Sequence, residues 1–173
     1  GPAAIVDPVV DAPGDREIGY RKADHPNCSA TLFDNLARNP DAVAVTGPAG
    51  TLTYRALCAE AARWGNAFAA AGLERGERIV FFLDDTPAYP AAFFGAVRAE
   101  MQANGLQRTI LVNGPDAPDG PFEAAAAFLA GQPETLDAAD TGPDDMAFWM
   151  YSSGSTGRPK GIVHLHHDMA YTQ

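Results

Sequence analysis

The chain has 173 residues, a length that fits one ordinary domain with a core of its own. Apolar residues make up 46% of it, which indicates a globular protein rather than a disordered one. The formal net charge is −10, and an acidic chain repels phosphate backbones, so we do not expect a nucleic-acid partner. No apolar run is long enough to span a bilayer, and there is no signal-peptide pattern. With Cys28 and Cys58 interpreted as reduced thiols, we expect a cytoplasmic protein without a membrane partner.

Residues 1–27 are rich in Pro, Asp and Gly and are interpreted as an irregular N-terminal arm. The regular pattern begins at residue 28. A short helix is predicted over 32–38, with Thr31 as its N-cap. Phe33, Leu36 and Ala37 are expected to lie on one face of this helix.

A β-hairpin is predicted next, with strands over 42–46 and 51–53 around the turn 47–50. Thr53 can cap a long Ala-rich helix that begins at residue 54 and that Gly72 ends. These signals place a hairpin directly before a helix.

The rest of the chain continues the alternation of strands and helices. Such alternation predicts an α/β fold with a doubly wound, mostly parallel sheet and flanking helices, in which ligands gather at the carboxyl ends of the strands. The predicted elements, in order, are a turn over 73–77, a strand over 78–83, a helix over 87–99 with Phe93, Phe94 and Val97 inward, a strand over 109–112, an amphipathic helix over 121–130 ended by Gly131, and a strand over 146–151.

The run from Tyr151 to Gly161 carries most of the functional information. Its eleven residues include three serines, one threonine, three glycines and a lysine, directly after an apolar stretch. Small residues let the backbone turn sharply and direct successive N–H groups into one concavity, hydroxyls add neutral donors, and the lysine adds a positive charge. The run therefore predicts a polyphosphate-binding loop.

Two other interpretations of this run fail. A Walker A loop ends in Gly-Lys-Ser/Thr and enters a helix, whereas here Pro159 precedes Lys160, Gly161 follows it, and residues 161–164 have the pattern of a strand. A flexible Ser/Gly linker is not expected between two apolar strand-like segments.

The sequence Ser-Ser-Gly-Ser-Thr-Gly-Arg-Pro-Lys-Gly over 152–161 resembles the phosphate loop of the adenylate-forming superfamily, which includes acyl- and aryl-CoA ligases, amino-acid adenylation domains and luciferases. Residues 51–57, 76–80 and 91–99 resemble further segments of its large N-terminal domain. Residues 160–168 look most like the benzoate- and aryl-CoA ligase branch. The resemblance covers most of 28–173, which we therefore interpret as part of such an N-terminal adenylation domain.

The resemblance implies ATP with Mg²⁺, coenzyme A and an aromatic, benzoate-like carboxylate as small-molecule partners. The acid would be converted to an acyl-adenylate with release of pyrophosphate, and then to the aryl-CoA thioester with release of AMP. An amino-acid adenylation domain and a non-catalytic phosphate-binding fragment remain alternatives. The residues implied to bind the nucleotide are the hydroxyl residues Ser152, Ser153, Ser155 and Thr156, the glycines Gly154 and Gly157, and Lys160.

The sequence departs from the family pattern in two places. Several tens of residues that the family has are expected to be missing between about Ala99 and Asn104, and a Cα separation above 3.8 Å there would support this. A full family member also continues for several hundred residues beyond the position of Gln173, with the acyl pocket and the catalytic lysine. No catalytic residue can therefore be named, and the 173-residue chain alone is expected to be inactive.

Three further features are given structural interpretations. The cluster His164, His166, His167 and Asp168 lacks the ligand set of a zinc site, so packing and hydrogen bonding are expected, with Asp168 capping a following helix. Asp84 and Asp85 are interpreted as a solvated turn rather than a Mg²⁺ site. Phe148 and Trp149 are expected to be core residues of a strand.

Overall fold

The computed structural model of the chain describes residues 27–47, 49–72, 79, 85–99, 110–112, 122–152 and 160–171. These ranges contain helices and strands in alternation, as the sequence predicts. In chain order they are α1 (Ala30–Arg38), β1 (Val43–Gly47), β2 (Gly50–Thr53), α2 (Tyr54–Ala70), α3 (Ala88–Arg98), β3 (Ile110–Val112), β4 (Phe122–Ala124), α4 (Ala125–Phe128), β5 (Met146–Ser152), β6 (Lys160–Leu165) and α5 (Asp168–Tyr171).

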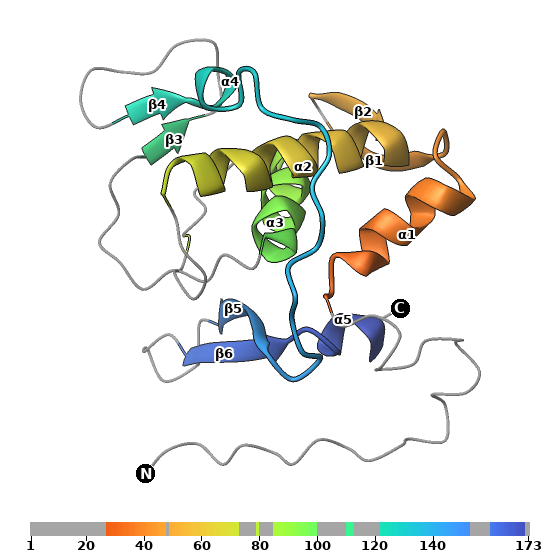
Figure 1. Cartoon of the computed structure of the whole chain (residues 1–173), viewed down its shortest axis with the longest axis vertical. Helices are drawn as coiled ribbons and strands as arrows, with labels where there is room; N and C mark the ends of the chain where they lie inside the picture. Colours follow the sequence, from red (N-terminus) through yellow and green to blue (C-terminus); the bar gives the residue numbers. More distant parts are fainter. Residues whose placement is uncertain are drawn as a thin grey trace.

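Helices α2 and α3 cross at the centre of the molecule, and the other elements surround them (Figure 1). The crossing is close because two glycines meet in it. A Cβ atom built on Gly95 would lie 2.4 Å from the carbonyl oxygen of Ala61, and one built on Gly65 would lie 2.8 Å from the carbonyl oxygen of Gly95. Neither helix can carry a larger residue at these positions without moving away from the other.

The main core lies around α2. The ring centroid of Trp64 is 5.5 Å from that of Phe68 and 6.0 Å from that of Phe128 on α4. These distances lie in the range at which aromatic rings attract each other beyond their burial of apolar area. The buried residues of this core are Leu32, Leu57, Cys58, Ala61, Trp64, Phe68, Ala91, Ala92, Ala96 and Ala125.

The described strands form three two-stranded sheets. Strands β1 and β2 form the expected antiparallel hairpin, β3 and β4 are parallel, and β5 and β6 are antiparallel. Thr53 caps α2 by accepting a hydrogen bond from the Ala56 N–H at 3.3 Å, and Gly72 follows the helix with a φ of 80°. Both of these sequence predictions are therefore confirmed.

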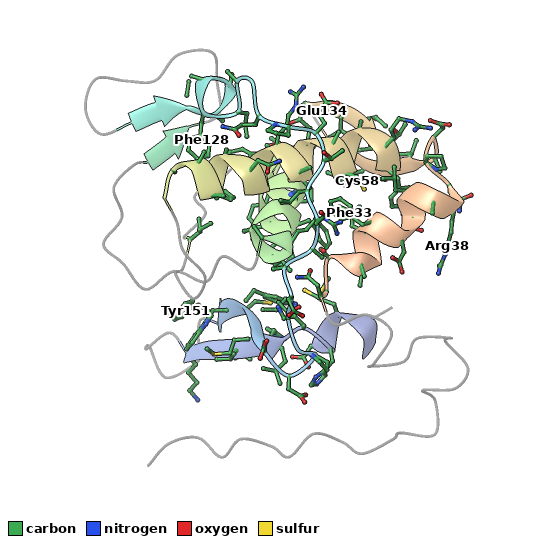
Figure 2. All side chains as sticks on the ribbon, viewed as in Figure 1. Phe33, Arg38, Cys58, Phe128, Glu134 and Tyr151 are labelled. Atoms are coloured by element: carbon green, nitrogen blue, oxygen red, sulfur yellow. The ribbon has the colours of Figure 1, made fainter. Side chains whose placement is uncertain are left out.

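A segment without helix or strand, residues 131–145, runs along the α2–α3 pair from α4 to β5 (Figure 1). We call it the crossing segment. The Asn66 amide donates to the carbonyl oxygens of Pro133 and Thr135, at 3.0 Å each, and Arg63 forms an ion pair with Glu134 (Figure 2). Further along, the Ala139 N–H donates to the Arg98 carbonyl oxygen at 2.8 Å. The crossing segment thereby joins the two helices to the β5–β6 hairpin.

The predicted start of the first helix is wrong. Helix α1 begins at Ala30 with Ser29 in the N-cap position, and Thr31 lies inside the helix, where its hydroxyl donates to the Cys28 carbonyl oxygen at 2.9 Å. The predicted apolar face is confirmed for Phe33 and Leu36, which pack against the core, but not for Ala37. Leu32 is the buried residue, whereas Ala37 is exposed.

The predicted helix over 121–130 is also partly wrong. Residues Phe122–Ala124 form β4, and only Ala125–Phe128 are helical. Pairing with the parallel strand β3 outweighs the helix propensity of the alanines, a propensity that tertiary contacts commonly override. Two predictions lie outside the described residues. One is the strand over 78–83, of which only Ile79 is described, and the other is the discontinuity near 99–104, of which only Ala99 is described.

Candidate functional site

The phosphate-loop candidate is carried by the β5–β6 hairpin. Ser152 is the last residue of β5, Lys160 is the first residue of β6, and these two residues are partners in the antiparallel ladder. Both strands agree with the sequence prediction. Of the candidate phosphate-binding residues, Ser153, Gly154, Ser155, Thr156 and Gly157 lie outside the described residues, while Lys160 has an exposed side chain.

The root of the hairpin is anchored by aromatic contacts. The ring of Phe148 on β5 lies 5.1 Å from that of Phe93 on α3, edge to face, and is stacked on the imidazole of His164 at 4.7 Å. Phe148 and His164 are Cα partners in the ladder, so this stack follows from the strand register. The hairpin is thus attached to the central helices at the end opposite its connection.

The end near the connection is more exposed. Trp149 and Tyr151 pack over Gly161, because a Cβ at that position would lie 3.2 Å from Tyr151 Cε1 and 3.4 Å from Trp149 Cε3. The expectation that Trp149 is a core residue is wrong, since 39% of its surface is exposed. Phe148 does pack against the core, as expected.

The histidines beyond β6 form a hydrogen-bonded cluster. The Asp168 carboxylate accepts from the Leu165 N–H at 3.0 Å and lies 3.3 Å from His164 Nδ1 and 3.2 Å from His167 Nε2. His167 Nδ1 lies 3.0 Å from the carbonyl oxygen of Pro143 in the crossing segment. The structural interpretation of this cluster is therefore supported. The capping prediction needs correction, because Asp168 is the first residue of α5 and its carboxylate binds the N–H of a residue that precedes the helix.

Alternation along a strand that continued to residue 166 would place His164 and His166 on one face, and this expectation is wrong. Strand β6 ends at Leu165, and the His166 ring is buried, with its Nδ1 accepting a hydrogen bond from the Cys28 N–H at 3.0 Å. Burial lowers the pKa of His166, and the charge of Asp145 raises it in partial compensation. Burial also raises the pKa of the Cys28 thiol to about 12. The sequence carried no signal for this contact between residues 138 positions apart.

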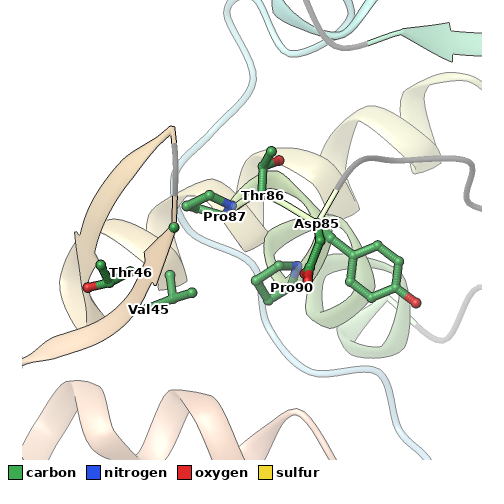
Figure 3. Close-up of a pocket in the computed structure, with 8 residues that line it drawn as sticks. Val45, Thr46, Asp85, Thr86, Pro87 and Pro90 are labelled. Atoms are coloured by element: carbon green, nitrogen blue, oxygen red, sulfur yellow. The ribbon is translucent and has the colours of Figure 1, made fainter.

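The described residues contain no group of three or more His, Cys, Asp or Glu side chains that could hold a metal ion. Asp85 is exposed, and it lines a hollow of about 380 Å³ with Val45, Thr46, Thr86 and Pro87, between β1 and the start of α3 (Figure 3). In Figure 1, β1 and β2 lie at one end of the α2–α3 pair and the β5–β6 hairpin lies on another side. The hollow is therefore separate from strands β5 and β6.

A sequence model of the family described as "AMP-binding enzyme" matches residues 32–112 and 101–173. The chain belongs to this family. The α/β fold class is confirmed as well, because the structure matches that of an anthranilate CoA ligase, AuaEII, solved in complex with anthranoyl-AMP. That match has a TM-score of 0.77 at 26% identity and covers 86% of this chain and 37% of the other.

Two curated relatives are aryl-CoA ligases. The chain is 34% identical to a 3-hydroxybenzoate–CoA ligase of Aromatoleum sp. (strain CIB), with 78% of this chain and 32% of the relative covered. It is 32% identical to a 3-hydroxybenzoate–CoA/4-hydroxybenzoate–CoA ligase of Thauera aromatica, with 67% of this chain and 30% of the relative covered. The chain thus spans about a third of the length of these relatives and corresponds to their N-terminal part. No described helix is both long enough and apolar enough to cross a membrane.

Proposed function

We propose that this chain is the N-terminal portion of an AMP-forming ligase that activates a benzoate-like aromatic carboxylate and transfers it to coenzyme A. The observation that carries the proposal is the Ser/Thr/Gly-rich sequence over 152–160, whose two ends are paired strand residues in a member of the AMP-binding enzyme family. The named substrates of the two curated relatives favour an aromatic acid over an amino acid.

In the proposed reaction, a carboxylate oxygen attacks the α-phosphate of ATP, a new C–O–P linkage forms, and pyrophosphate leaves. Negative charge grows on the departing phosphates, so donors that already point there lower the barrier. The hydroxyls of Ser152, Ser153, Ser155 and Thr156 and the ammonium of Lys160 are the proposed donors. Mg²⁺ would arrive with ATP, held mainly by phosphate oxygens and water.

In the second half-reaction, the thiol of coenzyme A attacks the acyl carbon of the adenylate and AMP leaves. The groups for this step are proposed to lie in the two thirds of the enzyme that this chain does not span. We propose a cytoplasmic location, which the two buried cysteines support because neither takes part in a disulfide.

The proposal is tested by pyrophosphate–ATP exchange with a full-length polypeptide that contains this chain, Mg²⁺ and a pooled panel of aromatic carboxylates. Exchange that depends on the aromatic acids is expected, and the 173-residue chain alone is expected to show none. Exchange that depends on amino acids instead would favour the adenylation-domain alternative. No exchange by a folded full-length protein with any acid would contradict the proposal.

We also propose that this chain lacks an internal stretch of its relatives, near Ala99 to Asn104. The alignment with the Aromatoleum ligase runs over 173 positions, but 78% of this chain is only about 135 residues. About 38 positions of that alignment therefore have no residue of this chain opposite them. The same holds for about 40 positions of the alignment with the Thauera ligase. The family model also matches the chain as two separate pieces that overlap over residues 101–112, which supports a discontinuity in this part of the chain.

A further inference from the structure

A buried histidine lies at the root of the β5–β6 hairpin, and the proposed reaction does not use it. His166 directly follows β6, and only 2% of its surface is exposed. Its Nδ1 accepts a hydrogen bond from the Cys28 N–H at 3.0 Å, close to the start of α1 (Figure 1). Its own backbone N–H donates to the carbonyl oxygen of Asp145 at 3.1 Å. His166 therefore joins the start of α1 and the crossing segment to the strand that begins at Lys160.

The contact continues from Cys28 to the central helices. The side-chain amide of Asn27 donates to the Val97 carbonyl oxygen on α3 at 3.1 Å, and its oxygen accepts from the Ser29 N–H at 3.0 Å. All three residues from 27 to 29 are buried. Asn27, Cys28 and His166 thus form a buried connection between α3 and the hairpin, which we call the root link.

The root link fixes the direction in which the hairpin points. The hairpin also contacts α3 through an apolar pair, in which the Phe148 ring lies 5.1 Å from that of Phe93. Apolar contacts have no preferred direction, so this pair alone would let the hairpin pivot, whereas a hydrogen bond weakens steeply when its angle changes. The apolar pair and the root link together define the orientation of β5 and β6 relative to α3.

This orientation matters at the other end of the hairpin, where the phosphate-loop candidate begins and ends. Lys160 precedes His166 by six residues, which corresponds to about 20 Å of extended strand. Over that length, a rotation of about 3° at the root moves the strand end by about 1 Å. A displacement of about 1 Å in a group that acts on the reacting atoms can cost about 10²-fold in rate. Ser152 moves with Lys160, because the two are partners in the ladder.

We infer that His166 is a positioning residue of the phosphate loop, which holds both ends of the loop at the polyphosphate of ATP through the root link. This inference rests on the proposed function. Within the proposed reaction, His166 acts in the first half-reaction alone, because pyrophosphate has already left when the thiol of coenzyme A attacks.

Separate assays of the two half-reactions in the full-length polypeptide test the inference. His166→Leu removes the acceptor for the Cys28 N–H, and it is expected to slow pyrophosphate–ATP exchange about 10²-fold. Thioester formation from coenzyme A and the synthetic adenylate of the acid that supports exchange is expected to keep the wild-type rate. His166→Asn, whose amide oxygen can accept the same hydrogen bond, is expected to restore exchange.

Two further variants keep the test decisive. Leu57→Ala is the control for lost stability, because Leu57 is a buried residue of the main core on α2, and it should leave both half-reactions unchanged per mole of folded protein. Asn27→Asp keeps the acceptor for the Ser29 N–H but has no donor for the Val97 carbonyl oxygen. It is expected to slow exchange without slowing thioester formation, and it replaces His166→Leu if that variant does not fold.

Calorimetric titration with Mg-ATP separates this inference from the proposed function. His166→Leu is expected to bind ATP about tenfold more weakly than the wild type, the cost of about one displaced hydrogen bond to a phosphate. A wild type that binds ATP but shows no exchange with any acid would end the proposed function, while weaker binding by His166→Leu would still support the inference. The inference is overturned if the wild type does not bind ATP, if His166→Leu exchanges at the wild-type rate, or if this variant slows both half-reactions equally.

Discussion

His166 is held in one protonation state by its surroundings. Only 2% of its surface is exposed, and its Nδ1 must be unprotonated to accept the hydrogen bond from the Cys28 N–H. The proton of the neutral ring is therefore on Nε2, a buried atom without a hydrogen-bond partner in the described part of the chain. A second proton would break the bond to Cys28 and leave a buried charge.

This arrangement predicts a loss of stability in mild acid. Because the pKa of His166 is lower in the folded state than its ordinary value of 6.5, the unfolded chain binds the proton first as the pH falls. The free energy of unfolding is expected to decrease below about pH 6.5, with this group contributing up to about 1.4 kcal/mol per pH unit.

Urea denaturation at several pH values between 7.5 and 5 measures this effect. In His166→Asn, whose amide oxygen can accept from the Cys28 N–H without titrating, the slope of stability against pH is expected to be shallower. An equal slope in the wild type and the variant would rule out His166 as its source.

The two cysteines are expected to react only after unfolding. Both are buried, and burial raises the pKa to about 12 for Cys28 and to about 11 for Cys58. The thiolate is the reactive species, so at pH 8 both access and reactivity are low. Ellman's reagent should react rapidly with no thiol in the native protein and with two thiols in urea. One thiol that reacts fast under native conditions would contradict the burial of that cysteine.

Thr156 gives the sharpest residue test of the phosphate-loop proposal. Removing one well-aimed donor to the transition state typically costs about 3 kcal/mol, or 10²- to 10³-fold in rate. Thr156→Ala in the full-length polypeptide is therefore expected to slow pyrophosphate exchange by about that factor. Thr46→Ala serves as the control, because Thr46 lies on β1 outside the loop, and this variant should catalyse pyrophosphate exchange at the wild-type rate. Equal rates for the two variants would remove Thr156 from the proposed site.

At the scale of elements, the α2–α3 crossing depends on the absence of two side chains. A methyl group on Gly95 would collide with backbone atoms of α2, which cannot rotate away as a side chain does. Alanine has a higher helix propensity than glycine by about 1 kcal/mol, but overpacking typically costs about 1–3 kcal/mol and the collision here is with a main-chain oxygen.

Gly95→Ala is therefore expected to lower the free energy of unfolding by about 1–2 kcal/mol. Gly47→Ala is the matched control, because its added Cβ would make only an ordinary contact of 3.5 Å with Pro87. Thermal or urea unfolding of both variants measures the difference. A Gly95→Ala protein as stable as Gly47→Ala would mean that the helices adjust without cost.

Elements with local signals were predictable from the sequence, and those that depend on distant partners were not. The cap at Thr53, the hairpin before it and the strands on both sides of the phosphate-loop candidate follow from turn residues, capping and apolar alternation. Strand β4 was missed because its pairing with β3 overrides an alanine-rich, helix-like pattern. The exposure of Trp149 was missed because an apolar residue in a predicted strand gives no sign of whether another element covers it.

At the scale of the whole molecule, the proposed internal deletion predicts that the missing stretch can be restored. Inserting the corresponding residues of the Aromatoleum ligase after Ala99 is expected to leave the stability of the chain unchanged or to raise it. A Gly/Ser linker of equal length is expected to cost about 1 kcal/mol of loop-closure entropy. Equal destabilisation by both inserts in urea denaturation would count against a deletion at this place.

The crossing segment has a consequence for synthesis of the protein on the ribosome. Helices α2 and α3 are complete when residue 98 has been made. Their partners in the crossing segment are made only later, because Arg63 binds Glu134 and Asn66 binds the carbonyl oxygens of Pro133 and Thr135. The bond between Cys28 and His166 cannot form until residue 166 has been made. At translation rates of about 5–20 residues per second, the helix pair waits for several seconds with its apolar surface uncovered. A chaperone that binds apolar segments would have its longest opportunity in that interval.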